Sequence, residues 1–271
     1  MLPVRDPSCV RGLLLIVDLL ATKNHRTPSP VEVPGFGSGA GADVPWGFLL
    51  ILVGGVTAVG VVAYLSYLST KKRRSGFRTM ATQLGLEYSL EDRFGLVGFP
   101  FSLFQRGDGR GVENVLSGTW QGLDVRAFDF WYFDESTDSN GHTSRSYYRF
   151  DCAVVPIAAA CPHLMIDHES FMTRLAGVLS FHDIEFEDEA FNRAFNVRGD
   201  DRKFASDLVD ARMMGWLTAH AGEYAFEVVG NRVLVAGPKV PPTELVQLIG
   251  TAKAFVEQVP RVVYSLYPVS G

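Results

Sequence analysis

A glycine-rich hexapeptide, RGDGRG at residues 106–111, is the stretch of this sequence that most resembles a ligand-binding motif. A nucleotide loop of the Gly-x-Gly-x-x-Gly kind should follow a strand and open a helix, because the helix N-terminus binds the phosphate. Here the chain continues as VENVLSGTW, which is typical of a strand. The sequence therefore predicts a glycine-rich loop between strands.

Two further groups of residues have the chemistry of a metal or acid–base site. His182 and Asp183 are an acid–base pair by type, but no nucleophile in a recognisable elbow accompanies them. The second group has metal-binding residue types in a spacing that matches no zinc pattern, since there is neither Cys-x-x-Cys nor His-Glu-x-x-His: Cys161, His163, Asp167, His168 and Glu169. We predict no catalytic residue, no metal ligand and no cofactor.

The chain holds only three cysteines, Cys9, Cys152 and Cys161. Cys152 falls in an apolar, strand-like run, and Cys161 directly precedes a proline. Because no disulfide framework is implied, we interpret Cys152 and Cys161 as reduced, partly buried thiols.

The elements that must position these residues begin with a membrane segment. Residues 46–68 are 23 residues without a charged side chain, and twelve of them are Leu, Ile, Phe or Val. As a helix this segment spans roughly 34 Å, enough to cross a bilayer. Trp46 lies at one end and Tyr64 and Tyr67 at the other, where aromatic rings settle among headgroups. We predict one transmembrane helix at 46–68.

The charges that flank this helix predict its orientation. Residues 71–90 hold five basic residues, whereas residues 26–45 hold only Arg26. The positive-inside rule therefore predicts a plasma-membrane protein with its N-terminus outside and its C-terminal domain in the cytoplasm. The lipid bilayer is an expected partner, and the basic cluster should contact lipid headgroups through Lys71, Lys72, Arg73 and Arg74.

The residues before the helix are predicted to form no folded domain. Residues 12–21 are too short and too polar to span, and residues 27–45 concentrate Pro, Gly, Ser and Ala. We expect residues 1–45 to be a disordered external tail. Gly54 and Ala58 have the spacing at which a second helix packs closely, so a homodimer is one alternative for the oligomeric state.

Residues 75–271 should form the folded domain. A short helical continuation ends near Gly85, and extended chain begins at Leu86. Residues 115–133 and 147–157 are rich in β-branched and aromatic residues, with a hairpin turn at Gln121-Gly122. A polar loop at 134–144, which contains the turn signal Asn140-Gly141, separates these strands. A meander of antiparallel strands is the simplest interpretation.

The second half alternates short strands and helices. Residues 164–166 read as a strand and residues 169–180 as a helix, and Asp200 or Asp201 should cap one longer helix striped by Phe204, Leu208, Ala211, Met214 and Leu217. A hairpin is expected around Gly230-Asn231, and Pro241-Pro242 should open a final helix striped by Leu245, Leu248, Ile249, Ala252 and Val256. The predicted class is α+β, a mainly antiparallel sheet with packed amphipathic helices behind one transmembrane helix.

Aromatic residues concentrate in the predicted strand at 128–133. Phe128, Phe130 and Tyr132 share one face by alternation. Core packing is the first interpretation, and a surface for a protein partner is the alternative.

The net charge excludes one partner class. The chain carries −5 overall, but residues 75–271 hold 17 Lys or Arg against 26 Asp or Glu. A domain this acidic lacks the field that gathers phosphates, so nucleic acid is not an expected partner.

Several phrases of the sequence resemble a known family. They are the anchor followed by KKRR, then LGLEYSLEDRFGL, RGDGRGVENVLSGTW, VRAFDFWYFDES, FNRAFNVRGDDRKFASDLVDARMMGWL and VPRVVYSLYP. Over residues 46–268 the chain resembles a family of bacterial, largely actinobacterial, membrane-anchored proteins with a domain of unknown function. The resemblance implies a single-pass membrane protein and names no activity.

Two functions remain open from the sequence. The first is a membrane-tethered cytoplasmic module that binds or scaffolds a protein partner. This function is favoured by the single anchor, by the acidic domain and by the lack of a catalytic motif in the sequence. The alternative is a membrane-bound hydrolase whose residues come together from distant strands.

Overall fold

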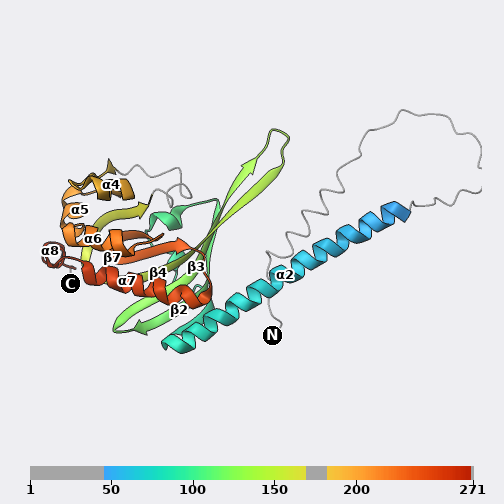
Figure 1. Ribbon diagram of the computed structural model, residues 1–271, viewed down its shortest axis with the longest axis horizontal. Coiled ribbons are helices and arrows are strands. Elements are labelled where there is room, and N and C mark those ends of the chain that lie inside the picture. Colours follow the sequence, from blue (N-terminus) through green and yellow to red (C-terminus); the bar gives the residue numbers. More distant parts are fainter. Residues whose placement is uncertain (1–45, 169–181, 270–271) are drawn as a thin grey trace, which may run out of the picture. The chain divides into compact units, whose positions relative to one another are not determined.

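The computed structural model describes residues 46–168 and 182–269, so the external tail and the helix expected at 169–180 lie outside the described residues. The chain divides into two compact units, residues 1–72 and 73–271. The first described element, helix α2 (Trp46–Leu84), begins in the first unit and ends in the second (Figure 1).

Helix α2 is 39 residues long, about 58 Å at the usual helical rise. Among the described residues it is the one helix long and apolar enough to cross a membrane, and none of its most apolar window is buried. The helix ends as predicted, because Gly85 adopts a φ of 69° and the Leu86 amide donates to the Ala81 carbonyl at 2.8 Å. This hydrogen bond closes a Schellman cap, which glycine favours.

The second unit is built on one antiparallel sheet, which confirms the predicted α+β class. Strands β1 (Glu87–Glu91), β2 (Gly109–Trp120), β3 (Leu123–Thr137) and β4 (Thr143–His168) form the expected meander. Beyond β4 lie β6 (Phe195–Gly199) and β5 (His182–Asp183), and β7 (Ala225–Pro238) also pairs with β4. The 26-residue strand β4 is therefore the centre of the sheet.

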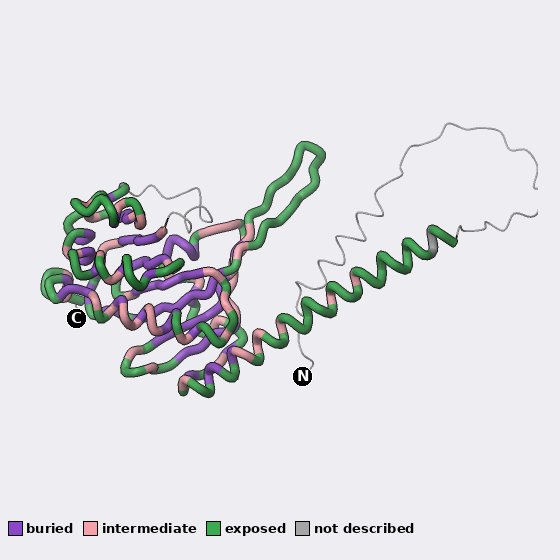
Figure 2. Tube along the Cα trace, viewed as in Figure 1, coloured by how far each residue is buried: buried purple, intermediate pink, exposed green. Residues whose placement is uncertain are grey.

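Each face of the sheet buries its own core. One core includes Ala127 and lies beneath the last turns of α2 and the helices α5 (Arg202–Leu208), α6 (Ala211–His220), α7 (Leu245–Gln258) and α8 (Arg261–Leu266). The other includes Phe128 and lies beneath the short 3-10 helices η1 (Leu96–Gly98) and η2 (Ser102–Gln105). Burial is concentrated in this sheet (Figure 2). Alternation along β3 sends neighbouring residues to the two cores.

The β2–β3 turn confirms the prediction at Gln121-Gly122. Both residues have positive φ, 48° and 81°, which is the backbone of a type I′ turn. Trp120 and Leu123 pair directly across it.

The hairpin predicted at Gly230-Asn231 is wrong. Strand β7 runs straight through these residues and pairs with β4 on both sides of them. Gly230 pairs with Cys161 and Arg232 with Pro156, so β4 has several extra residues opposite one residue of β7. The left-handed φ of 57° at Gly230 serves this bulge, because glycine adopts it without steric cost.

The single helix predicted after Asp200 is two helices, α5 and α6. The Asp201 carboxylate caps α5 as expected, and the Asp210 carboxylate accepts the Met213 amide at 2.8 Å and caps α6. The second cap breaks the helix and shifts its register. Leu208 and Leu217 are buried as predicted, but Ala211 is exposed.

The final helix follows the predicted stripe for most of its length. Pro242 begins a 3-10 turn, η3 (Pro242–Glu244), which leads into α7. Four of the five stripe positions are buried: Leu245, Leu248, Ile249 and Ala252. The fifth, Val256, is half-buried, because Phe255 takes the inward position. The segment at 164–166 is a strand as predicted, and it belongs to β4.

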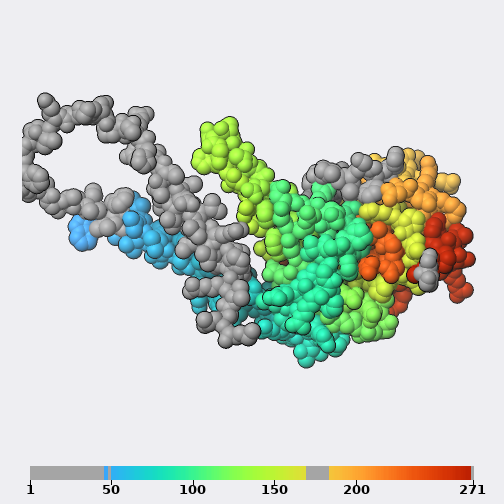
Figure 3. All heavy atoms as spheres, turned by 180° about the vertical axis from the view of Figure 1, so that it is seen from behind, coloured from blue at the N-terminus to red at the C-terminus, as the bar shows by residue number. Residues whose placement is uncertain are grey.

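The loop predicted at 134–144 is mostly strand. β3 continues to Thr137 and β4 begins at Thr143, so only residues 138–142 form the turn. These strand residues are polar and exposed on both faces, and therefore lack the alternation that indicates a strand. The hairpin stands out from the rest of the second unit (Figure 3).

Candidate functional site

Arg73, in the part of α2 that belongs to the second unit, binds two carboxylates on the sheet. Its Nε and Nη2 donate to the two oxygens of Asp129 at 2.7 and 2.6 Å, and Nη2 also donates to Asp151 at 2.5 Å. Its Nη1 donates to the Val240 carbonyl at 2.6 Å. A planar guanidinium with five donors can make this fork, whereas a lysine ammonium cannot. We call Arg73, Asp129 and Asp151 the arginine joint.

The rest of the joint is also hydrogen-bonded. Asp129 and Asp151 are direct cross-strand partners on β3 and β4. The Asn114 amide donates to Asp129 at 2.9 Å and accepts the Tyr88 hydroxyl, and the Val240 amide donates to Asp151 at 2.8 Å. All four carboxylate oxygens therefore accept a hydrogen bond.

Burial sets the electrostatics of the joint. Asp129 and Asp151 are 4% and 1% exposed. Burial raises the pKa of Asp151 above its usual range, and Arg73 opposes that shift. Burial also lowers the pKa of the nearby Lys239. The arrangement holds a charged residue of α2 against the sheet, and the described joint presents no nucleophile.

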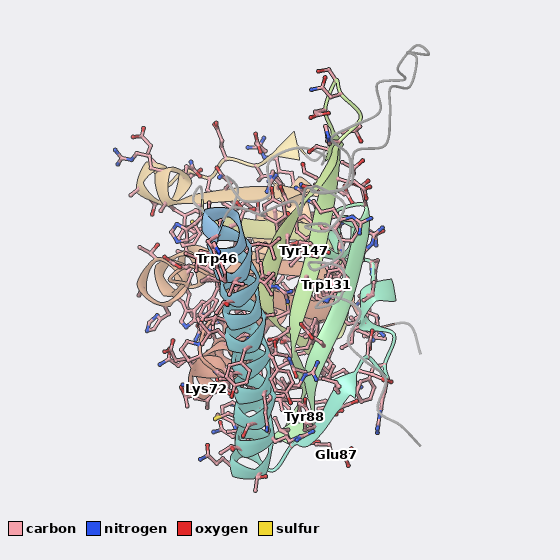
Figure 4. All side chains as sticks on the ribbon, turned by 90° about the vertical axis from the view of Figure 1, so that its right-hand side faces the viewer. Trp46, Lys72, Glu87, Tyr88, Trp131 and Tyr147 are labelled. Atoms are coloured by element: carbon pink, nitrogen blue, oxygen red, sulfur yellow. The ribbon has the colours of Figure 1, made fainter. Side chains whose placement is uncertain are left out.

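Beyond the joint, the same face of the sheet carries a partly exposed aromatic cluster. Trp131 and Phe133 follow Asp129 at alternate positions of β3, and Tyr147 of β4 pairs with Phe133. Their ring centroids lie 5.3 to 6.4 Å apart, and Tyr147 is 53% exposed. Trp131 and Tyr147 lie on neighbouring strands (Figure 4). We call these three residues the aromatic cluster.

Two glycines of RGDGRG form the floor of this cluster. Gly111 pairs with Trp131 and Gly109 with Phe133, and a Cβ on Gly111 would meet the Trp131 ring at 2.6 Å. The rings therefore lie flat against bare backbone. The Asp108 carboxylate accepts the Glu135 amide at 2.7 Å. As predicted, the motif leads into a strand and opens no helix. The loop predicted between strands is wrong in part, because residues 109–111 already belong to β2 and the 3-10 helix η2 precedes the motif.

Two arginines flank the aromatic cluster. The Arg145 guanidinium lies 4.7 Å from the centre of the Phe133 ring and pairs with Glu135 at 3.1 Å. Arg149 pairs with Glu113 at 3.2 Å. The surface thus combines one exposed and two partly exposed aromatic rings with arginines whose charges are balanced by glutamates.

The opposite face holds a set of residues whose types suit a hydrolase. His163 Nε2 lies 2.5 Å from Glu227 and 3.3 Å from the Ser102 hydroxyl, and the same Glu227 oxygen accepts the Ser102 amide at 2.6 Å. In a Ser-His-acid triad the acid binds Nδ1 and leaves Nε2 for serine. Here one nitrogen faces both groups, so this arrangement fastens η2 to the sheet and leaves Nε2 unsuited to activate Ser102.

The residues considered for metal binding are split between the two faces. Cys161 belongs to the core under the helices, and the His168 ring packs on Phe195 of the same core. Asp167 lies on the other face, where it pairs with Arg198 at 2.6 Å. Glu169 lies outside the described residues. Within the described ranges, no three metal-ligating side chains come together. His182 and Asp183 form β5 at the edge of the sheet.

The structure places the other predicted residues as follows. Phe128, Phe130 and Tyr132 are at most 2% exposed, so core packing describes them and these rings offer no surface to a partner. Their burial follows from the 3-10 segment that covers this face.

The predicted lipid contacts and the cysteines lie elsewhere. Lys71 and Lys72 are exposed, while Arg73 is hydrogen-bonded within the arginine joint. Cys152 and Cys161 are free and buried, as predicted.

Sequence reasoning missed the arginine joint. A signal was present, because Asp129 and Asp151 interrupt apolar strand runs as Phe-Asp-Phe and Phe-Asp-Cys. A carboxylate in a buried strand requires a partner. Arg73 was instead grouped with its neighbours as a lipid contact.

Comparison with known proteins assigns no family. No protein-family profile matches the chain, and no curated protein matches it. One similar solved structure is the mycobacterial trehalose monomycolate transport factor A, at 14% identity and a TM-score of 0.49, covering 73% of this chain and 96% of that one. A similarity of this extent carries no argument about function. The resemblance to an actinobacterial membrane-anchored family stays a prediction.

Proposed function

We propose that the protein is a single-pass membrane protein whose cytoplasmic domain, residues 75–271, binds or scaffolds a protein partner at the plasma membrane. Residues 46–68 are the spanning segment, and the N-terminus faces the outside of the cell. Lys71 and Lys72 contact lipid headgroups. The homodimer through Gly54 and Ala58 remains an alternative for its assembly.

One observation carries this proposal: the helix that is apolar enough to span a membrane continues without a break into the core of the folded unit. Phe77, Met80 and Ala81 of α2 are buried, and Arg73 is held by two carboxylates. The folded unit therefore follows the spanning segment within a few residues of chain. Attachment this close to the bilayer suits a scaffold, because it raises the effective concentration of the bound partner at the membrane.

The projecting β3–β4 hairpin supplies a binding element. From Asp134 to Thr137 and from Thr143 to Ser146 the two strands pair with each other, while β2 begins opposite Phe133 and β7 ends opposite Phe150. Unpaired strand edges accept an extended segment of a partner by main-chain hydrogen bonds.

Hydrolase chemistry receives less support from the described residues. The Ser102, His163 and Glu227 arrangement directs one histidine nitrogen to both partners. The cavity beside Glu227 has a volume of about 10 Å³, which is room for roughly one water.

The topology is tested with a reporter that is active only in the cytoplasm, fused after Gly271. We expect activity, because five basic residues follow the spanning segment and one precedes it. Activity of an exterior-only reporter in the same position would refute the cytoplasmic assignment.

Binding is tested by photo-crosslinking in cells from position Ser144 on the hairpin, with Ser206 on α5 as the matched exposed control. We expect a discrete adduct with one protein from Ser144 and none from Ser206. Equal adducts from both positions, or none from Ser144, would contradict a binding role for the hairpin.

A further inference from the structure

We propose that the aromatic cluster of Trp131, Phe133 and Tyr147 docks into the headgroup layer of the bilayer that α2 spans, so that the domain contacts the membrane at a second place. This inference rests on the proposed membrane attachment and names the lipid surface as the occupant of the cluster.

The first support is the position of the cluster within the folded unit. Trp131 and Phe133 lie two and four residues beyond Asp129 on the same face of β3, and Asp129 is the residue that Arg73 binds. At about 3.4 Å per residue, the backbone positions of Trp131 and Phe133 lie roughly 7 Å and 14 Å along the strand from Asp129. The cluster is therefore next to the place where α2 enters the domain.

The second support is the length of chain between the spanning segment and the joint. Arg73 comes five residues after Leu68 in one unbroken helix, which is about 8 Å of rise. The polar layer on each side of a bilayer is roughly 5 to 8 Å thick, from a total of about 40 to 45 Å around a 30 Å core. Even a fully extended stretch of five residues reaches no more than about 18 Å, so the cluster, which lies next to Arg73 in the folded unit, is within reach of the headgroups.

The third support is the chemistry of the surface. Tryptophan and tyrosine settle at the bilayer interface, because their rings are apolar and carry a polar edge. Arg145 and Arg149 flank the rings with long side chains whose stems can lie in the interface and whose charged ends can reach phosphate. Glu135 and Glu113 balance these arginines. Docking should therefore depend on the rings and change little with salt or with the anionic lipid fraction.

The geometry also favours lipid over a protein groove. Gly109 and Gly111 keep the floor of the cluster flat, so the rings form a low ridge with Tyr147 as its most exposed member. Attachment through α2 makes docking intramolecular, and a small patch then suffices.

The test uses the four tryptophans of the chain: Trp46, Trp120, Trp131 and Trp216. In each of three full-length variants one of Trp46, Trp120 or Trp131 is kept and the others are replaced by phenylalanine. Each variant is reconstituted in nanodiscs of phosphatidylcholine brominated near the glycerol end of the acyl chains, since bromine quenches tryptophan only on close approach. Matching thermal unfolding to the parent ensures that the variants are folded.

We expect Trp46 and Trp131 to lose most of their fluorescence and Trp120, at the other end of the β2–β3 hairpin, to keep it. Quenching of Trp46 without Trp131 would overturn the docking proposal and leave the membrane attachment intact. Equal quenching of Trp120 and Trp131 would overturn it also, because contact would not be specific to the cluster. Loss of quenching at Trp46 would refute the membrane attachment itself.

A second measurement keeps all four tryptophans. Tyr147→Ser and the control Tyr148→Ser remove neighbouring tyrosines on opposite faces of the hairpin, and acrylamide, which stays in water, reports exposure. We expect acrylamide quenching in nanodiscs to rise for Tyr147→Ser and to stay at the parent level for Tyr148→Ser. The same rise in both variants would contradict docking through this face.

Discussion

Arg73 and Arg198 bind carboxylates on opposite faces of one sheet. The two sites differ in how many of the buried carboxylate oxygens accept a hydrogen bond. Arg73 reaches two aspartates and a carbonyl, and every oxygen of both carboxylates accepts a hydrogen bond. Arg198 donates to one oxygen of Asp167 at 2.6 Å. The second oxygen of Asp167 has the Asn196 side chain near it but no hydrogen bond of normal geometry in the described ranges.

This difference separates a joint between elements from a local pair. Arg73 connects a helix to two central strands and a loop more than fifty residues away, whereas Arg198 and Asp167 lie on the paired strands β6 and β4. A fully satisfied buried network fixes a unique geometry, and a partly satisfied one tolerates change. The first arrangement therefore fixes how residues 73–84 of α2, the part within the folded unit, lie against the sheet.

Replacing Arg73 should have the largest effect. Arg73→Met leaves two buried carboxylates without a counter-charge, so the full chain in detergent should lose about 3 to 5 kcal/mol of unfolding free energy, measured by urea denaturation. Arg73→Lys should rescue only part of this loss, because an ammonium cannot donate to all these acceptors at once.

Two variants control this prediction. Lys72→Met changes the exposed neighbour and should shift stability by less than about 0.5 kcal/mol. Combining Arg73→Met with Asp129→Asn and Asp151→Asn removes all the charges and should recover most of the loss. If the three side chains were not coupled, the triple variant would lose as much unfolding free energy as the three single variants together, which would contradict this prediction.

The Asp167 pair should show itself in the pH dependence of stability. Burial raises the pKa of Asp167 to about 6, against the opposing effect of Arg198. Between its usual value near 4 and about 6, the folded state binds more protons than the unfolded state, so this group makes stability fall as pH rises through that window. The contribution is on the order of 2 to 3 kcal/mol.

Asp167→Asn should flatten the decline between pH 4 and 6 without lowering stability near neutral pH, because the raised pKa means that the fold favours a neutral group here despite Arg198. Urea denaturation at several pH values measures both effects. An unchanged slope would show that Asp167 does not carry the proton linkage.

The sequence predicted elements whose causes are local. The β2–β3 turn depends on two residues that adopt positive φ, and α7 follows from an apolar stripe of helical period. The α5–α6 break was missed, because an aspartate inside an apolar-periodic run gives no sign of whether it caps a new helix or faces solvent. Gly230-Asn231 has the composition of a turn and serves a bulge, because β4 offers partners on both sides of it.

The arginine joint could not be found from spacing, because its members are separated by 56 and 78 residues. The basic run KKRR gives four residues of one type, and only the fold shows that Arg73 faces the sheet while Lys71 and Lys72 are exposed. Periodicity assigned the aromatic residues of β3 to two faces correctly. Which face is covered depended on residues 93–105, whose 3-10 turns have no periodic signal.

The smallest predicted effect tests how far the joint extends beyond its charges. The Tyr88 hydroxyl donates to Asn114, which in turn donates to Asp129. Asn114 is 2% exposed and has a φ of 55°, a conformation that asparagine tolerates better than most residues. Tyr88→Phe keeps the ring and removes the donor, so the Asn114 oxygen loses its partner at a cost of about 1 kcal/mol. Tyr147→Phe, which removes a hydroxyl from an exposed ring, is the matched control and should leave stability unchanged in detergent. In the Arg73→Met background the effect of Tyr88→Phe on stability should shrink. Without Arg73 to hold it, the Asp129 carboxylate no longer holds the Asn114 side chain in place, so the hydrogen bond from Tyr88 contributes less. Equal effects of Tyr88→Phe in both backgrounds would show that the joint ends at its carboxylates.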